Sequence, residues 1–257
     1  MLATILELVV APGLVGLATL ASRRWSERVG GHVSAFPVIV GPVLLITAHE
    51  HGAAFAARAA NGTLLGVVAL SGFAVGYGRT ARHSGSLVSL AVGWAFAAML
   101  AVLAHAVPLP SAGALALAAV SLAAAHHALG AQSAGRVATA VPPWDIPFRM
   151  ALTALLVGSL AAAAGRVGPL VAGMLASLPV LACVLAVFTH RQQGGQAVLG
   201  LLRGMLSGMV AFVAFCEIVA LLLVPVGVLA AFTTATLVAV GAEALAASGG
   251  LREPAAA

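Results

Sequence analysis

Long apolar stretches separated by short polar turns dominate this chain. The pattern predicts nine helices, at residues 3–21, 33–49, 54–78, 86–107, 111–129, 149–165, 168–190, 196–223 and 227–247. Several of them approach or exceed the roughly 20 residues that an α-helix needs to cross a bilayer. Only one long polar connection occurs, from Gly130 to Arg149, and its prolines disfavour continuous helix. We therefore predict an all-α, polytopic integral membrane protein.

One stretch of the chain occurs twice, at a constant offset of 142 residues. Gly-His-Val-Ser-Ala-Phe-Pro at 31–37 corresponds to Gly-Met-Leu-Ala-Ser-Leu-Pro at 173–179. The same ungapped offset relates further pairs: Gly16 with Gly158, Arg24 with Arg166, Thr47 with Thr189, Gly52 with Gly194, Gly62 with Gly204, and Gly66 with Gly208. Because a single shift matches proline and several glycines together, we interpret the chain as an internal duplication. Residues 1–107 would form the first repeat, 108–148 a linking helix and a Pro-rich loop, 149–248 the second repeat, and 249–257 a polar tail.

Composition agrees with a membrane location. Of the 257 residues, 62% are hydrophobic and 7% are charged, which is too few to cover a water-soluble domain of this length. The formal charge of +5 does not indicate nucleic-acid binding, because no basic run extends beyond Arg23-Arg24. The chain holds no nucleophile triad or phosphate loop, so we expect neither an enzyme nor a cofactor.

The arginines give the orientation of the predicted helices. With the N-terminus outside, ten of the 12 basic residues fall on the inside and two, Arg58 and Arg166, fall outside. This positive-inside bias predicts an N-terminus outside and a C-terminus in the cytoplasm, in the inner (cytoplasmic) membrane. A single linking helix would then make the second four-helix repeat enter from the opposite side. The two repeats are therefore predicted to be inverted.

Inverted repeats are typical of secondary transporters, in which two units rock about a site near the midplane. We expect a transporter of a small solute by alternating access. A non-catalytic membrane scaffold or accessory subunit is the alternative, and it predicts no solvated central cavity. A channel would require a continuous polar stripe, which the helices do not show. The expected partners are the lipid bilayer, a small solute and protons, and an oligomer is compatible with the sequence.

Glu217 is the strongest candidate for chemistry within the membrane. It has apolar neighbours on both sides, and a lone carboxylate there is costly unless it is paired or protonated. It could carry a proton, or it could form an ion pair that joins two helices, and both interpretations stay open. If Glu217 carries a proton, transport would be coupled to proton movement.

The other intramembrane charges fall into two groups by predicted depth. Glu7, Arg58 and Glu217 lie toward the outside, and we hypothesise that they form an outer gate. The inner group would form a second gate, and it contains Arg149, Arg203 and Glu243. The alternative is that these long side chains extend to the membrane interface from helix ends.

Pro37 and Pro179 occupy matched positions inside two predicted helices. Proline removes a backbone hydrogen bond and kinks a helix, so both helices are candidates to line a solute path. Ser177, beside Pro179, and Asn61 are the polar candidates on that path. The two Gly-x-x-x-Gly pairs, 62–66 and 204–208, are predicted to be seams of close helix packing.

His49-Glu50-His51 lacks the i,i+4 spacing of a helical metal-ligand pair, and the remaining histidines are expected elsewhere. We predict no metal site. Cys183 and Cys216 lie in apolar stretches and are expected to pack as small hydrophobic residues.

The segment Ser22-Arg23-Arg24, followed by Gly31-x-x-x-x-Phe36-Pro37 and Gly52, resembles the GlpM-like family of small four-helix bacterial inner-membrane proteins. The second half resembles a weaker copy, with Leu178 in place of the phenylalanine and Arg166 in place of the basic cluster. The duplicated plan is also similar to the drug/metabolite transporter superfamily. That similarity implies small-solute transport and assigns no residue.

Overall fold

The computed structural model describes residues 2–106, 109–130, 142, 144–164 and 179–250. Within these ranges every regular element is an α-helix, which confirms the predicted all-helical class. The helices are α1 (Leu2–Arg24), α2 (Glu27–Ala35), α3 (Val40–His51), α4 (Ala53–Thr80), α5 (Ser86–Ala106), α6 (Ser111–Leu129), α7 (Asp145–Ala164), α9 (Val180–Gln193), α10 (Gly195–Val226) and α11 (Val228–Gly250).

Six helical stretches of the described residues are long and apolar enough to cross a membrane. They are Glu27–His51, Ala53–Thr80, Ser86–Ala104, Ser111–Leu129, Gly195–Val226 and Val228–Leu245. Apolar side chains also face outward, since Leu229, Leu237 and Leu245 of α11 are 83, 72 and 74% exposed. An exposed apolar helix surface of this kind is consistent with lipid around it. The chain is thus a multi-pass helical membrane protein, with six candidate spans among the described residues where nine were predicted.

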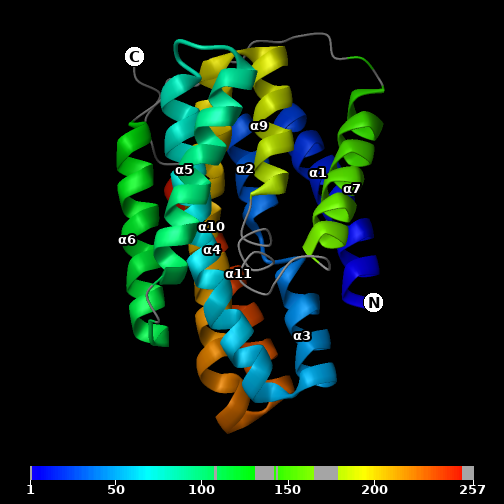
Figure 1. The fold of residues 1–257 in the computed structure, drawn as a ribbon, viewed down its shortest axis with the longest axis vertical. Coiled ribbons are helices and arrows are strands. Elements are labelled where there is room, and N and C mark those ends of the chain that lie inside the picture. Colours follow the sequence, from blue (N-terminus) through cyan, green and yellow to red (C-terminus); the bar gives the residue numbers. More distant parts are fainter. Residues whose placement is uncertain (1, 107–108, 131–141, 143, 165–178, 251–257) are drawn as a thin grey trace.

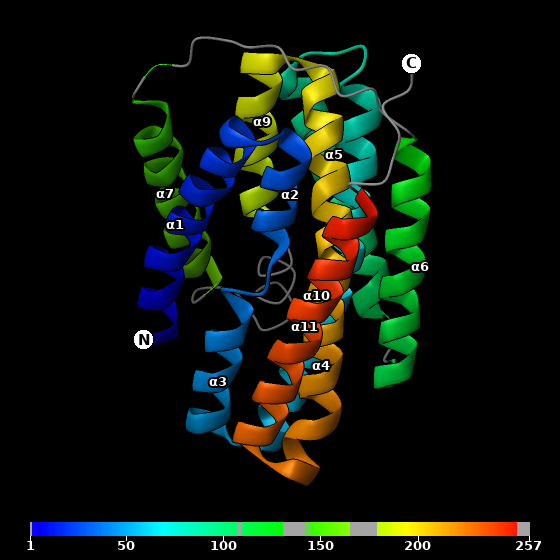
Figure 2. The same ribbon diagram turned by 180° about the vertical axis from the view of Figure 1, so that it is seen from behind.

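The helices α4 and α10 form the centre of the molecule and run antiparallel along its long axis (Figures 1 and 2). They have 28 and 32 residues, about 42 and 48 Å at the helical rise, so each is longer than a hydrocarbon core of roughly 30 Å. Both helices are largely buried, with Phe73 and Tyr77 of α4 and Leu202 and Leu206 of α10 among the largest enclosed side chains. The other helices pack around this pair.

The predicted helix at 33–49 is in fact two helices, α2 and α3, separated by residues 36–39. The first begins earlier than predicted, because the Ser26 side chain accepts a hydrogen bond from the Val29 backbone N–H at 3.3 Å and caps the helix at Glu27. The second begins at Val40, after Pro37 has interrupted the backbone ladder.

The polar connection predicted from Gly130 to Arg149 is shorter than expected at its C-terminal end. Helix α7 begins at Asp145, and Pro147 lies in its first turn, where a missing N–H has no intrahelical partner in any case. The helix predicted at 168–190 is described only from Val180 onward, as α9. Its earlier residues and most of the polar connection lie outside the described ranges.

Two sharp turns between helices lie 142 residues apart. Gly52 joins α3 to α4 with φ of 87°, and Gly194 joins α9 to α10 with φ of 86°, a conformation that favours glycine. Both glycines donate their N–H to the carbonyl four residues earlier, in Ala48 and His190. The same offset relates α1 to α7, α3 to α9, α4 to α10 and α5 to α11, and the members of each pair run in opposite directions (Figures 1 and 2).

Candidate functional site

The break between α2 and α3 follows from Pro37. Phe36, which precedes it, has φ of −62° and ψ of 141°, the extended conformation that a following proline favours. Val38 N–H then donates to Phe36 O at 2.7 Å in a tight turn, and the helical ladder resumes with Gly41 N–H donating to Pro37 O at 3.2 Å. The end of α2 and the start of α3 therefore lie next to each other, separated by residues 36–39.

Pro179 stands at the matched place in the second half, immediately before α9. Cys183 N–H donates to Pro179 O at 2.9 Å, which is the first helical hydrogen bond of α9. The amides between Pro179 and Cys183 belong to the first turn and have no intrahelical acceptor.

A cavity of about 560 Å³ lies between these two helix ends. This volume is in the range of small-molecule sites in proteins. Both Pro37 and Pro179 line it. The described residues that line the cavity are Leu14, Ser34, Ala35, Phe36, Pro37, Ile39, Val40, Val43, Ala59, Gly62, Thr63, Gly66, Val67, Leu70, Pro179, Val180, Leu181, Ala182, Met205, Met209 and Phe212. Helices α1, α2, α3, α4, α9 and α10 thus contribute to one site.

The two Gly-x-x-x-Gly pairs differ in their surroundings. A Cβ added at Gly208 would lie 2.9 Å from Ala35 Cβ, so this glycine holds α2 directly against α10. A Cβ added at Gly62 or Gly66 would meet no atom within 4 Å. The predicted seam is therefore present on α10, whereas the matched pair on α4 is part of the cavity wall.

Glu217 is buried in α10 and is 8% exposed. The Ser111 hydroxyl, at the start of α6, lies 3.2 Å from both of its carboxylate oxygens and can donate to one of them. Its described partner is thus a neutral hydroxyl at a helix N-terminus, and Glu217 is not among the cavity-lining residues. Arg58, predicted to share the outer gate, is exposed, and the Glu7 side chain lies outside the described part.

Arg149 belongs to a buried polar network at one end of the molecule. Its Nε donates to Asp145 Oδ2 at 2.8 Å, and its second guanidinium nitrogen donates to Gln192 Oε1 at 2.7 Å. Gln192 Nε2 returns a hydrogen bond to Asp145 Oδ1, and Arg23 Nη2 lies 2.5 Å from Asp145 Oδ2. We call Arg23, Asp145, Arg149 and Gln192 the Asp145 network. It joins the end of α1, the start of α7 and the end of α9.

The other two residues of the predicted inner gate have separate partners. Glu243 Oε1 lies 2.7 Å from His32 Nδ1, which connects α11 to α2. Arg203 Nη2 lies 3.1 Å from His126 Nε2, which connects α10 to α6. The structure therefore places Arg149, Arg203 and Glu243 in three different contacts.

Asn61 is half-buried in α4, beside the cavity-lining Gly62. Its Oδ1 atom is buried and accepts no hydrogen bond from a described residue. Ser177, the other polar candidate, lies outside the described residues.

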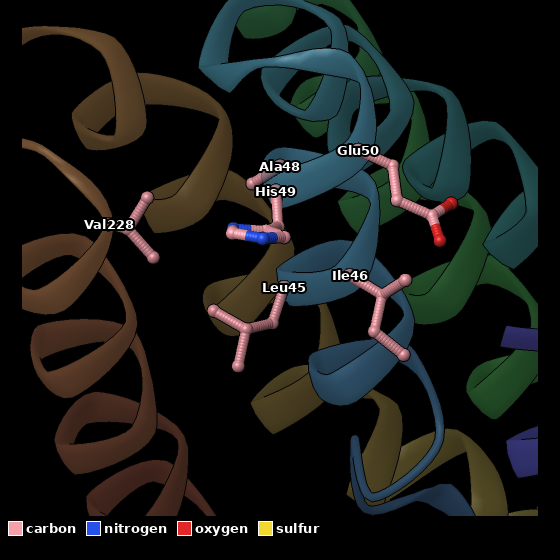
Figure 3. A pocket seen from close by; sticks show the side chains of 6 residues that line it. All are labelled: Leu45, Ile46, Ala48, His49, Glu50 and Val228. Carbon is pink, nitrogen blue, oxygen red and sulfur yellow. The ribbon is translucent and has the colours of Figure 1, made fainter. Parts of the chain in front are cut away.

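A second pocket, of about 490 Å³, lies between α3 and the start of α11, at the end of the molecule opposite to the Asp145 network. Figure 3 shows that His49 lies on the side of α3 toward Val228 and that Glu50 extends from the other side of the helix, and both residues line the pocket. No group of three or more potential metal ligands occurs among the described residues. Cys183 and Cys216 are buried and free.

The sequence analysis did not identify Met205 and Met209 as residues that line the cavity. Met205 and Met209 are one helical turn apart, a spacing that could have marked a common face, but core packing predicts the same spacing. Asp145 was placed in a loop, although its i,i+4 spacing to Arg149 is typical of a helical ion pair.

Comparison with models of protein families, with curated proteins and with solved structures finds no match to this chain.

Proposed function

We propose that this chain is a secondary transporter of a small solute and that the cavity between the α2–α3 break and α9 is its solute site. One observation carries the proposal: the α2–α3 break at Pro37 and the start of α9 at Pro179 border a single cavity of about 560 Å³. Discontinuous helices that meet at a central site are the usual construction of such transporters.

The opposed directions of the matched helices support alternating access. In an inverted duplication, each half can adopt the conformation of the other, and exchange of the two conformations moves the opening of the site from one side to the other. The nine predicted spans, the repeat bounds and the resemblance to the GlpM-like family remain part of this proposal.

Arginine placement supports the orientation that we propose. Arg23 and Arg24 end α1, Arg79 lies in the last turn of α4, and Arg191 lies in the last turn of α9. These helix ends lie at one end of the molecule (Figures 1 and 2). We assign this end to the cytoplasm, which leaves the N-terminus outside and locates the protein in the inner membrane.

The Asp145 network lies at the same end and is a candidate for the cytoplasmic closure. It connects α1 and α7 to α9, whose first turn borders the cavity. A closure of this kind must break for the site to open, and buried charges that exchange partners are suited to that role because they tolerate no intermediate, unpaired state.

Proton coupling through Glu217 is the mechanism that we propose for driving transport. The carboxylate is buried and its described partner is neutral, so protonation would remove an uncompensated charge. Glu217 lies on α10, the same helix as Phe212 of the cavity wall, so a shift of α10 would connect the two sites.

Cysteine accessibility tests the proposal. In a Cys183→Ala, Cys216→Ala background, we would place a cysteine at Ser34 in the cavity and, as a control, at Thr236 on the exposed face of α11. A membrane-impermeant thiol reagent would be added to right-side-out and to inverted vesicles. The transporter proposal predicts labelling of the Ser34 site from both sides and none at Thr236. No labelling at Ser34 from either side would favour the scaffold alternative, whose interior is dry.

A further inference from the structure

The chemistry of the cavity wall restricts the solutes that can bind there. No described lining residue carries a charged side chain. Two hydroxyl groups are present, and both use their hydrogen locally: Ser34 Oγ donates to Gly31 O at 2.7 Å, and Thr63 Oγ1 donates to Ala60 O at 2.6 Å. Their oxygen lone pairs can still accept a hydrogen bond from a solute.

The two buried acidic side chains of the described residues have partners away from the cavity. Asp145 is bonded to Arg149, and Glu217 is bonded to Ser111. An ionised solute in the cavity would lose its hydration shell and find no described side chain of opposite charge on the wall, which makes its transfer unfavourable. The first-turn amides of α9 would offset only part of that cost for a carboxylate.

The apolar part of the wall is deformable. Met205 and Met209 project from α10 on one face, with unbranched, polarisable side chains that adapt to different shapes. Phe36 and Phe212 add aromatic surface, and Gly62 and Gly66 leave two positions on the cavity side of α4 without side chains. This combination suits an apolar body more than a fixed array of polar groups.

We propose that the cavity binds an uncharged, largely apolar organic solute that donates no more than one or two hydrogen bonds, to the Ser34 and Thr63 hydroxyl oxygens. The inference rests on the proposed function and adds the substrate class to it. An alkyl alcohol or a similarly weakly polar compound fits this description, and carboxylates and quaternary amines do not.

Photolabelling of the full-length protein in lipid nanodiscs tests the inference. Three probes would be compared: a diazirine-bearing medium-chain alkanol, the carboxylate of the same chain length, and the trimethylammonium analogue. Adducts would be counted by mass spectrometry on the peptide that contains Met205 and Met209. Gly66→Leu fills the cavity, because a Cβ at this position meets no atom within 4 Å, and Gly241→Leu, equally open but on α11, is the matched control.

We expect the alkanol to label this peptide in the wild type and in Gly241→Leu. In Gly66→Leu the labelling should fall about tenfold, which corresponds to a loss of about 1.4 kcal/mol of binding free energy. The charged analogues should label the peptide no more than they do in Gly66→Leu. The melting temperatures of both variants would be measured to check that the fold is retained.

Two other results would overturn the inference, and they differ in what they mean for the proposed function. If a charged analogue gives labelling that Gly66→Leu removes, the cavity is a solute site but its substrate class is wrong. If no probe gives labelling that Gly66→Leu removes, the cavity binds none of these solutes, and the proposed function loses its site as well.

Discussion

Arg149 Nε donates a hydrogen bond of 2.8 Å to Asp145 Oδ2, one turn earlier in α7, and both side chains are almost fully enclosed, at 3 and 1% exposure. Two opposite charges in such a place stabilise each other only as a pair, because each alone would be desolvated without compensation. Gln192 and Arg23 complete the arrangement from α9 and α1. The Arg149–Asp145 pair, with Gln192 and Arg23, therefore joins α1, α7 and α9.

Replacement of Arg149 should destabilise the protein strongly. Arg149→Gln removes the more buried of the two cations that contact Asp145. Loss of one partner of a buried pair costs about 3–5 kcal/mol, and because Arg23 remains we expect the lower end of this range. Arg24→Gln, at the exposed end of α1, is the control and should change stability by less than about 0.5 kcal/mol. Thermal unfolding in detergent measures both, and equal melting temperatures would contradict the network described above.

The two glycine pairs should respond in opposite ways to a larger side chain. Gly208→Leu forces a Cβ to 2.9 Å from Ala35 Cβ and should cost about 1–3 kcal/mol or more from overpacking. Gly66→Leu enters open space and gains helix propensity, so its melting temperature should equal or exceed that of the wild type. The same unfolding assay compares the two variants. Destabilisation of Gly66→Leu as large as that of Gly208→Leu would show that α4 is closely packed at this position.

The native cysteines should be unreactive in the folded protein. Cys183 is 5% exposed and Cys216 is fully enclosed, and Trp94 Nε1 lies 2.8 Å from Cys183 Sγ. A thiol reagent should therefore modify neither until the protein is unfolded, when two thiols per chain become available. Mass spectrometry before and after denaturation measures this. Rapid modification of Cys183 in the native state would indicate that α9 opens to solvent.

Glu217→Gln should change the pH dependence of transport more than stability. The amide retains an acceptor oxygen for the Ser111 hydroxyl and removes the need to bury a charge, so the melting temperature should hold or rise slightly. If Glu217 carries the coupled proton, uptake by proteoliposomes should lose its dependence on an imposed pH gradient. An unchanged pH profile would remove Glu217 from the coupling mechanism, and Ser111→Ala would then show whether the contact is structural alone.

Helix bounds were predicted most accurately where proline and glycine flank a helix. Helix α6 has the predicted bounds, because Pro110 precedes it and Gly130, with φ of 66°, ends it. The sequence also contained signals that were overlooked, such as the Ser26 cap that begins α2 well before the predicted start.

The cavity and the Asp145 network could not be predicted in the same way. Gly66 and Gly208 have identical spacing to their partner glycines, yet one borders a cavity and the other is packed against α2. Spacing along one helix does not define what lies opposite it. Likewise, the contact of Arg149 with Gln192 joins residues 43 positions apart and depends on the placement of α7 beside α9.

We propose that the cavity opens to one side at a time and that the Asp145 network closes the cytoplasmic side. The most direct test is the labelling rate of a cysteine at Ser34, measured from each side of the membrane with and without Asp145→Asn. We expect Asp145→Asn to raise the rate from the cytoplasmic side and to lower it from the outside, because weakening one closure shifts the population toward the state that this closure opposes. Rates that rise together on both sides, or that do not change, would contradict alternating access through this site.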